Sequence, residues 1–194
     1  MLFDIISPIY ALFFDYQVKY YKKILNRIKN EVDISKYKRV LDLGCGTGAL
    51  SYALQDLGIE VVGVDPSSGM LKQARKKLKG TQVELIKINP GEKLPFDEDS
   101  FDLAISSYVI HGLNPMERKE IYKELCRISK GKVIFHDYNQ NRSLITDIAE
   151  FLENGDYFNF IKVAKSEMEK HFKDVKVVDV DKKAAWYILK HCNI

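Results

Sequence analysis

Five short runs rich in β-branched residues recur along the chain, and segments in which apolar residues have helical spacing separate them. The runs cover residues 39–43, 59–65, 82–88, 101–107 and 132–138. Strands that alternate with helices in this way form a parallel sheet covered by helices on both faces. A chain of 194 residues is long enough for one such α/β domain.

Further elements are expected at both ends of the chain. Residues 11–30 have helical periodicity and end in a basic turn, whereas residues 176–191 predict two strands around a tight polar turn. Asn114, Pro115 and Glu117 predict a helix start with an N-cap, a first-turn proline and a capping-box acid. Ser166 and Glu169 repeat the capping-box pattern and predict a second start.

The composition is that of an ordinary globular protein, with 46% hydrophobic and 29% charged residues. The net charge of +3 arises from 30 basic and 27 acidic residues, which is too balanced to predict a nucleic-acid partner. The basic run at residues 74–80 is expected to be the solvated face of a helix. A small or weakly charged substrate fits this balance better.

The cysteines and the N-terminus bear on the compartment. Cys45, Cys126 and Cys192 are far apart, odd in number and without a CxxC pair, so we expect neither a disulfide framework nor a metal site. Residues 1–17 are apolar but contain Asp4 and Pro8, and they lack a basic start and a cleavage site. We therefore predict a cytoplasmic protein with no membrane span, in which this stretch is a structural or lid segment.

A glycine-rich turn follows the first predicted strand. Gly44, Gly46 and Gly48 lie in VLDLGCGTGAL, between that strand and a helix. Without Cβ atoms the backbone can approach a ligand and present N–H groups to it. A tight turn alone would account for one glycine, but three within five residues indicate a binding loop.

Asp65 ends the second predicted strand, in VVGVDPSS. In doubly wound folds an acid at this position accepts hydrogen bonds from the ribose hydroxyls of a nucleoside ligand. Asp65 can also cap the helix that follows, and both roles are compatible. The adjacent glycine loop favours the ribose interpretation.

Asp42, which precedes the first glycine, distinguishes two ligand classes. Gly44, Gly46 and Ala49 satisfy the loose dinucleotide pattern GxGxxG/A, so a nicotinamide or flavin cofactor is a competing prediction. The carboxylate of Asp42 would repel a diphosphate in a partly dehydrated site. S-adenosylmethionine has no phosphate, and Asp42 can attract the ammonium of its amino-acid end.

The chain resembles the class I S-adenosylmethionine-dependent methyltransferases, and within them the small enzymes similar to quinone-biosynthesis methyltransferases. The resemblance covers residues 39–137 and is carried by VLDLGCGTG, VVGVDPSSGML, EKLPFDEDSFDLAISSYVIHGL and KVIFHDYN, in that order. It implies a Rossmann-like, doubly wound, mostly parallel seven-stranded sheet with helices on both faces and a C-terminal antiparallel hairpin. It also implies S-adenosylmethionine as the cofactor and S-adenosylhomocysteine as the product.

The resemblance implies three groups of cofactor-binding residues. The glycine loop and its aspartate would line the methionine end of the cofactor: Asp42, Gly44, Cys45, Gly46 and Gly48. Asp65 would bind the ribose. The residues at the start of the next helix would border the adenine: Pro66, Ser67 and Met70. Met70 is equally expected as a helical core residue.

One segment departs from the family pattern. Where the family commonly has an aspartate that accepts from the adenine amino group, this chain has Asn89 and Pro90, followed by Gly91 and Glu92 at the usual spacing. The side-chain oxygen of Asn89 can still accept a hydrogen bond, whereas Pro90 removes a backbone donor. Adenine binding is therefore expected to differ here.

Candidates for proton transfer follow the fourth and fifth strands, whose carboxyl ends are where ligands collect in open α/β sheets. Ser106 and Ser107 complete the predicted cofactor-binding set, and His111, His136 and Tyr138 are the catalytic candidates. His111 comes first because VIHGL borders the transferable methyl in the family and a histidine titrates near neutral pH. Each has a structural alternative: His111 at a helix start, His136 at a strand end, and Tyr138 as a packing aromatic.

We predict a single domain over residues 1–194, divided into an N-terminal helical lid segment (1–36), a cofactor-binding core (37–138) and C-terminal helices with a β-hairpin (139–194). Its predicted function is in-line methyl transfer to a small-molecule acceptor. The alternatives are a non-catalytic cofactor-binding protein and a nicotinamide oxidoreductase. The acceptor pocket would be roofed by the insertion around residues 151–160 and by N-terminal aromatics, which can equally be packing residues: Phe3, Tyr10, Phe13, Phe14, Tyr16 and Tyr20.

Overall fold

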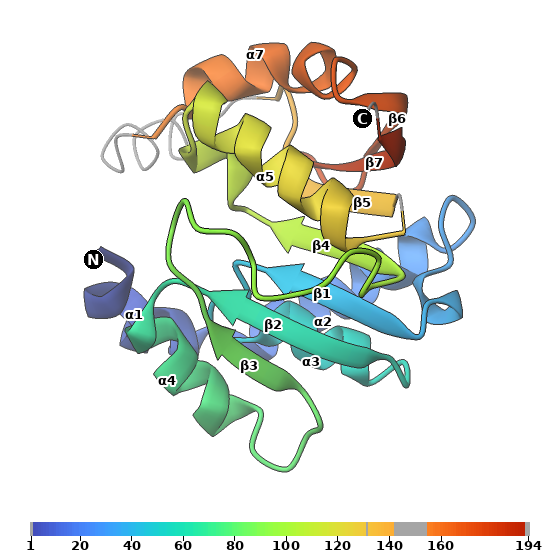
Figure 1. Ribbon diagram of the computed structural model, residues 1–194. Coiled ribbons are helices and arrows are strands. Elements are labelled where there is room, and N and C mark those ends of the chain that lie inside the picture. The colour runs from blue at the N-terminus through green and yellow to red at the C-terminus, as the bar shows by residue number, and fades with distance from the viewer. Residues whose placement is uncertain (1, 131, 142–154, 193–194) are drawn as a thin grey trace. The chain divides into compact units, whose positions relative to one another are not determined.

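The five β-branched runs form five strands of a seven-stranded sheet in the computed structural model, which describes residues 2–130, 132–141 and 155–192 (Figure 1). The strand order is β3-β2-β1-β4-β5-β7-β6. This mixed sheet confirms the predicted α/β class and the C-terminal antiparallel pair. The strands are β1 Arg39–Leu43, β2 Glu60–Asp65, β3 Glu84–Lys87, β4 Leu103–Ser107, β5 Lys132–Tyr138, β6 Phe172–Asp179 and β7 Ala184–Cys192.

The chain divides into two compact units, residues 1–94 and 95–194. In the first unit β1, β2 and β3 are parallel, with Asp42 opposite Gly63 and Asp65 opposite Lys87. Helices α3 (Ala49–Gln55) and α4 (Ser68–Lys77) follow β1 and β2, so both begin where a parallel strand ends. Parallel strands covered by helices bury their side chains, and β1 is buried at every position after Arg39.

The N-terminal segment forms two helices where the sequence predicted one over residues 11–30. They are α1 (Leu2–Leu12) and α2 (Phe14–Ile28), separated by Phe13, and a short 3-10 turn η1 (Ile34–Lys36) leads into β1. Pro8 does not end α1: the carbonyl of Asp4, which would accept from a residue-8 N–H, accepts from the hydroxyl of Ser7 at 3.1 Å. No described helix is long and apolar enough to cross a membrane.

In the second unit β4 and β5 are parallel, while β7 pairs antiparallel with both β5 and β6. The unit also contains the 3-10 turn η2 (Ile110–Gly112), α5 (Pro115–Ile128) and α7 (Tyr157–Met168). The helix start predicted at Asn114 is confirmed, because its side chain accepts from the N–H of Met116 and of Glu117. The start predicted at Ser166 is wrong: Ser166 lies inside α7 and its hydroxyl donates to the carbonyl of Val163.

The expectation of no disulfide is also wrong, since Cys126 and Cys192 are bonded. These residues are 66 positions apart, so their spacing gave no local signal. The topology brings them together: Lys132 at the start of β5 pairs with Lys190 near the end of β7, and Cys126 belongs to the last turn of α5. Cys45 is a free, buried cysteine.

Candidate active site

The glycine loop after β1 adopts a conformation that requires glycine. Gly44, Gly46 and Gly48 have positive φ angles of 73°, 54° and 85°. A Cβ on Gly48 would also come within 2.6 Å of a Leu78 methyl carbon. Other residues at these positions would strain the turn that carries the chain from β1 into α3.

Three N–H groups at the start of this loop are bound within the protein. Those of Gly44 and Cys45 donate to the carbonyl of Val64 at 2.8 and 3.0 Å, and that of Gly46 donates to Asp65 Oδ2 at 2.9 Å. The loop is therefore tied to the end of β2. Phosphate-binding loops direct such N–H groups at their anion, so this arrangement does not provide a diphosphate cradle.

Asp42 presents a buried carboxylate beside the loop. Its side chain is 1% exposed; Oδ2 accepts from Ser51 Oγ at 2.6 Å, whereas Oδ1 is buried without a hydrogen-bond partner in the described residues. Burial raises the pKa of this carboxyl to about 7, and the charge of Asp65 adds to the rise while the Ser51 bond opposes it. A cationic ligand group would satisfy the buried oxygen, so the site fits the ammonium of an amino acid.

Replacing Asp42 by asparagine is expected to stabilise the ligand-free protein at pH 8. Because the folded-state pKa of about 7 exceeds the ordinary value of 3.8, the protonated form is favoured and stability falls as pH rises through this interval. The ionised carboxylate costs about 4 kcal/mol at pH 8, and an unpaired asparagine amide would cost about 1–3 kcal/mol. We therefore expect the free energy of unfolding, measured by urea denaturation, to rise by about 1–3 kcal/mol in the variant.

The same Asp42→Asn variant tests the role that the resemblance implies for Asp42: a ligand ammonium bound there would lose its charged partner, so S-adenosylhomocysteine should bind more weakly. The gain in stability should shrink at pH 5, where wild-type Asp42 is mostly protonated. A Ser51→Ala variant is the control, since it removes the hydroxyl donor and keeps the carboxylate. A gain that did not change with pH would contradict the assignment of the buried charge.

Asp65 organises the turn between β2 and α4. It is 7% exposed, Oδ1 accepts from the N–H of Ser67 at 2.8 Å, and Oδ2 accepts from Gly46. Burial raises its pKa, and the two backbone hydrogen bonds oppose the rise. The helix N-cap is Ser67, whose hydroxyl accepts from Met70 N–H at 3.1 Å, so the alternative role of Asp65 as the cap is not the observed one.

The other predicted adenine-side residues differ in exposure. Met70 is 4% exposed and Pro66 is partly buried, whereas residues 89–92 form an exposed turn after β3. In this turn the Asn89 side-chain N–H donates to Glu92 Oε2 at 2.9 Å, and Gly91 has a φ of 79°. The amide of Asn89 is thereby oriented by a residue of the same segment.

Asp4 contacts this region and was not predicted as part of it. Its Oδ1 accepts from Ser67 Oγ and from Gly69 N–H, both at 2.8 Å, and these bonds lower its pKa to about 2, the Gly69 bond most. A Cβ on Gly69 would lie 2.7 Å from the Cα of Asp4, so the close approach of α1 to α4 requires glycine there. Only the presence of an acid in an otherwise apolar stretch hinted at this contact.

In the second unit, His111 and Asp137 form a buried pair. His111 Nδ1 lies 2.7 Å from Asp137 Oδ1, and the two side chains are 8% and 1% exposed. Asp137 also accepts backbone N–H groups from Ile110, His111 and Tyr138 at 3.2, 3.4 and 2.8 Å. Since a carboxylate only accepts, the proton of the neutral imidazole is on Nδ1, which makes Nε2 the basic nitrogen.

His136 has a different environment. It is 1% exposed, its Nδ1 lies 3.0 Å from Ser107 Oγ, and burial lowers its pKa to about 4. It is therefore neutral near pH 7. Ser106 is 1% exposed in β4, and Ser107 is partly buried at the end of that strand.

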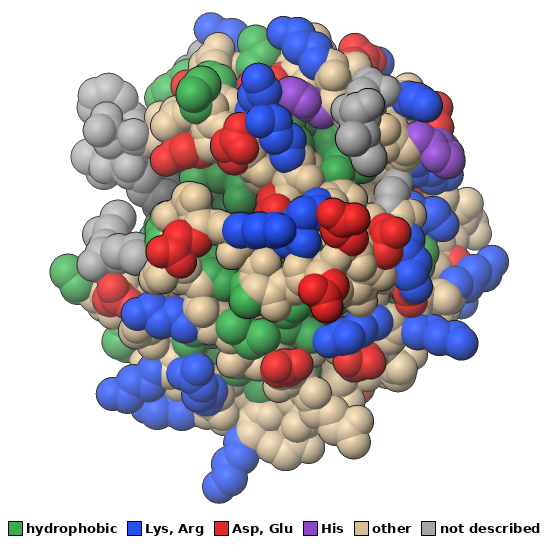
Figure 2. Space-filling model, in the orientation of Figure 1, with side chains coloured by type: hydrophobic (Ala, Val, Ile, Leu, Met, Phe, Trp, Pro, Cys, Tyr) green, Lys and Arg blue, Asp and Glu red, His purple; other side chains and the backbone are tan. Residues whose placement is uncertain are grey.

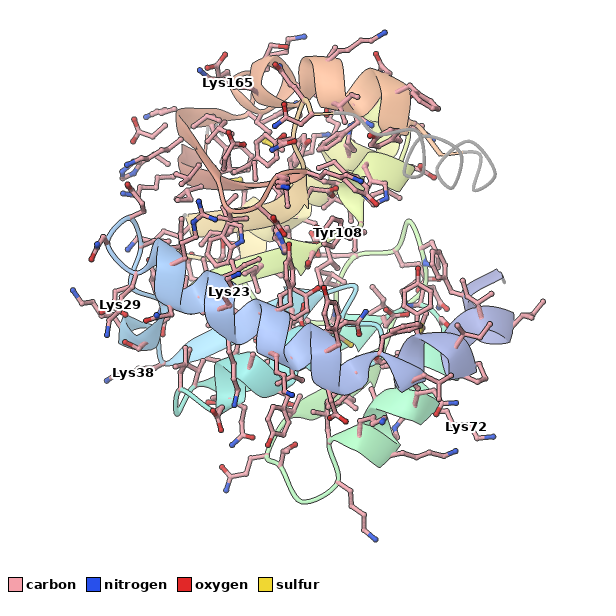
Figure 3. All side chains as sticks on the ribbon, turned by 180° about the vertical axis from the view of Figure 1, so that it is seen from behind. Lys23, Lys29, Lys38, Lys72, Tyr108 and Lys165 are labelled. Atoms are coloured by element: carbon pink, nitrogen blue, oxygen red, sulfur yellow. A yellow bond between two sulfur atoms is a disulfide. The ribbon has the colours of Figure 1, made fainter. Side chains whose placement is uncertain are left out.

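Aromatic rings surround the His111–Asp137 pair. The centroid of the Tyr138 ring lies 4.8 Å from that of His111, 5.1 Å from Tyr108 and 5.0 Å from Tyr157. Tyr108, labelled in Figure 3, has a positive φ of 54°, which is uncommon for a non-glycine residue. Backbone strain of this kind is concentrated at functional sites. Of the catalytic candidates, the structure thus brings His111, His136 and Tyr138 together around Tyr108.

Arg118 supports the turn that carries His111 and was also missed. This fully buried side chain makes two hydrogen bonds to Glu167 of α7, at 2.7 and 2.8 Å. Its Nη1 donates to the carbonyl of Leu113, just after η2, and to Asp156. Nothing distinguished this arginine from the other charged residues of PMERKEIYKEL.

The amino-acid sequence is similar to those of known methyltransferases. Residues 40–132 match the family model of a methyltransferase domain. The demethylmenaquinone methyltransferase of Clavibacter sepedonicus is 37% identical over 105 residues, which cover 53% of this chain and 42% of that protein. The ubiquinone/menaquinone biosynthesis C-methyltransferase UbiE of Campylobacter jejuni is 31% identical over 139 residues, which cover 66% of this chain and 57% of that protein.

A solved structure shares the fold. The PH0226 protein from Pyrococcus horikoshii OT3 aligns with a TM-score of 0.69 and 22% identity, covering 87% of this chain and 88% of that one. The chain spans about half the length of the two curated relatives. The family model and the relatives show that residues 40–132 form a methyltransferase domain similar to the class I S-adenosylmethionine-dependent enzymes, whose cofactor is S-adenosylmethionine.

Proposed function

We propose that the protein transfers the methyl group in line to a small-molecule acceptor that carries a dissociable proton, with His111 as the base that accepts this proton. The observation that carries the proposal is the 2.7 Å contact between His111 Nδ1 and Asp137. A buried carboxylate that orients an imidazole is a recurring way to make its other nitrogen a general base. The relatives named for demethylmenaquinone and quinone biosynthesis support a small-molecule acceptor.

On the cofactor side, Asp42 would hold the ammonium of the methionine end and Asp65 the ribose hydroxyls. The glycine loop would let the ligand approach the backbone closely, because Gly44, Gly46 and Gly48 have no Cβ atoms. Ser67 and Met70 would border the adenine, together with the turn at residues 89–92. These assignments are supported by the Asp42 oxygen that has no hydrogen-bond partner among the described residues, and by the burial of both aspartates.

On the acceptor side, the chain's residues would align the acceptor and remove its proton. When bound, S-adenosylmethionine would supply a methyl group on a positively charged sulfur, and this sulfur would leave as a neutral thioether. The acceptor atom donates the electron pair of the new bond to carbon, and its proton moves to His111 Nε2. Tyr108, Tyr138 and Tyr157 would contact the acceptor and exclude water, which strengthens the interactions within the site.

We retain the division of the chain as part of this proposal. Residues 1–36 would act as a lid segment, 37–138 as the cofactor-binding core and 139–194 as the C-terminal helices and hairpin. Helix α1 supports the first of these roles, because Asp4 contacts the Ser67 turn. Of the segment around residues 151–160, positions 151–154 lie outside the described residues.

The acceptor can be identified with methyl-labelled cofactor. The protein would be incubated with it and a panel of small phenols, hydroquinones, amines and carboxylic acids, and products heavier by one CH₂ sought by mass spectrometry. A labelled product from an acceptor with a dissociable proton supports the proposal. Labelling restricted to proteins or nucleic acids added to the same mixture would overturn it.

Replacing Asp65 by alanine is expected to weaken the binding of S-adenosylhomocysteine. A hydrogen bond to a charged acceptor contributes about 1.5–3 kcal/mol, so losing one ribose bond should lower affinity at least about tenfold. Isothermal titration calorimetry would measure this change. Asp56→Ala is the control, because Asp56 is an exposed acid that pairs with Lys22. Equal affinities of wild type and Asp65→Ala would remove the ribose assignment.

A further inference from the structure

Helix α1 carries an exposed apolar surface that the fold does not use. Ten large hydrophobic side chains are exposed in the described residues, and seven of them lie between positions 3 and 16. Clustered apolar exposure of this kind marks an interaction site, whereas single exposed residues do not. We define the α1 face as Ile5 (78% exposed), Ile9 (57%), Leu12 (80%), Phe13 (55%) and Tyr16 (71%).

The opposite side of α1 is held against the protein. Ser7 and Ala11 are buried there, and Phe14 continues this side at the start of α2. Asp4 bonds to the turn before α4, and the close approach at Gly69 leaves no room for a side chain. The α1 face therefore points outward from a helix whose inner side is fixed. Ile5, Ile9 and Leu12 have the spacing of one helical stripe, which Phe13 and Tyr16 extend past the end of α1.

Basic residues flank the α1 face. Helix α4, which packs beside α1, carries the exposed residues Lys72, Arg75 and Lys76. Figure 3 shows Lys72 projecting beside α1, and Figure 2 shows lysine and arginine side chains gathered over α4. Helix α2 adds the exposed residues Lys19 and Lys23. The acids nearest in sequence are Asp4, which is bonded to the Ser67 turn, and Asp15, which is exposed.

We propose that the α1 face binds the surface of an anionic lipid bilayer, with α1 lying in the interface. An apolar helical stripe beside lysines is the pattern of an interfacial helix, and its 11 residues are too few to cross a bilayer. The flanking lysines match the negative charge of lipid headgroups. A second copy of the chain would bring like basic flanks together, which disfavours self-association through this face. The proposal does not depend on the identity of the methyl acceptor.

Binding of the full chain to vesicles tests this proposal. Sedimentation with vesicles of equal parts phosphatidylglycerol and phosphatidylcholine should retain the protein, whereas pure phosphatidylcholine should retain much less. Ile9→Glu/Leu12→Glu should reduce retention at least about tenfold, because it places charges in the apolar contact. Lys72→Gln/Lys76→Gln should reduce retention on the anionic vesicles by about fivefold per lysine. Added salt should also reduce this retention.

Two controls make the outcome specific. Leu57→Glu changes an exposed apolar residue outside α1, 44% exposed, and should leave vesicle binding unchanged. S-adenosylhomocysteine binding and thermal unfolding of every variant would establish that its fold is intact. The proposal is overturned if wild type does not bind anionic vesicles, if Ile9→Glu/Leu12→Glu binds them as wild type does, or if the face instead mediates lipid-independent dimers that this variant abolishes.

Discussion

Reduction of the Cys126–Cys192 disulfide is expected to lower the free energy of unfolding by about 4 kcal/mol. The bond closes a loop across a sequence separation of 66 residues and so restricts the unfolded chain. In a chain of this length the loss should lower the melting temperature by about 10 °C. Urea unfolding with and without a thiol-free reductant would measure the change in the free energy of unfolding.

The Cys126→Ser/Cys192→Ser variant is the matched control for this experiment. It should show the lower stability in both conditions and respond no further to reductant, because the remaining Cys45 is a free thiol. Alkylation before reduction should modify neither Cys126 nor Cys192 in the oxidised wild type. Identical unfolding midpoints of the oxidised and reduced wild type would contradict a stabilising bond.

The disulfide also shows where reasoning from sequence fails. Cysteine spacing is informative when the partners lie in one motif, but Cys126 and Cys192 meet only because β7 returns antiparallel along β5. The cytoplasmic location was predicted partly because the sequence showed no such pair. The observed disulfide removes that reason, because disulfides are rare in reducing compartments.

Most features that depend on neighbouring residues were predicted, although the capping-box pattern at Ser166 did not mark a helix start. The alternation of β-branched runs and helical segments gave the fold class, and the capping box at Asn114 was found because its partners are at most three residues away. The glycine turn after β1 was predicted because a strand, a turn and a helix follow one another directly in the chain.

Features that depend on distant residues were missed. Asp4 meets Gly69 across 65 positions, and Arg118 meets Glu167 across 49. The glycine pattern likewise does not reveal where the loop N–H groups are directed, and the Val64 carbonyl that takes two of them belongs to the next strand. Such pairings are set by tertiary packing, for which one sequence carries no local signal.

The sequence was sufficient to rank His111 first among the candidate bases, but it did not reveal the residue that orients it. His111 was preferred because of the motif around it, whereas nothing in the sequence paired it with Asp137. The structure joins them across 26 positions, by one hydrogen bond between side chains and by backbone N–H groups of the His111 turn. Asp137 is therefore proposed as a positioning residue that acts through His111.

Replacing His111 by asparagine is expected to lower kcat by a factor of about 10²–10⁴, the usual contribution of a general base. The shorter amide can still donate to Asp137, but it lacks Nε2. Affinity for S-adenosylhomocysteine should stay unchanged, because the cofactor residues are untouched. The rate would be measured as methyl-labelled product from the acceptor found in the panel, with the exposed His191→Asn as the control.

Replacing Asp137 by asparagine separates positioning from simple structural support. The amide of the new asparagine would direct an N–H toward His111 Nδ1 and favour the tautomer that carries the proton on Nε2. Because Nε2 could then no longer accept the acceptor's proton, kcat should fall although His111 remains. The acid limb of the pH–rate profile should move to lower pH, because the carboxylate no longer stabilises the protonated ring. A destabilised but otherwise normal enzyme would keep its profile. If His111→Asn retained the wild-type kcat, proton transfer to this histidine would not contribute to the reaction.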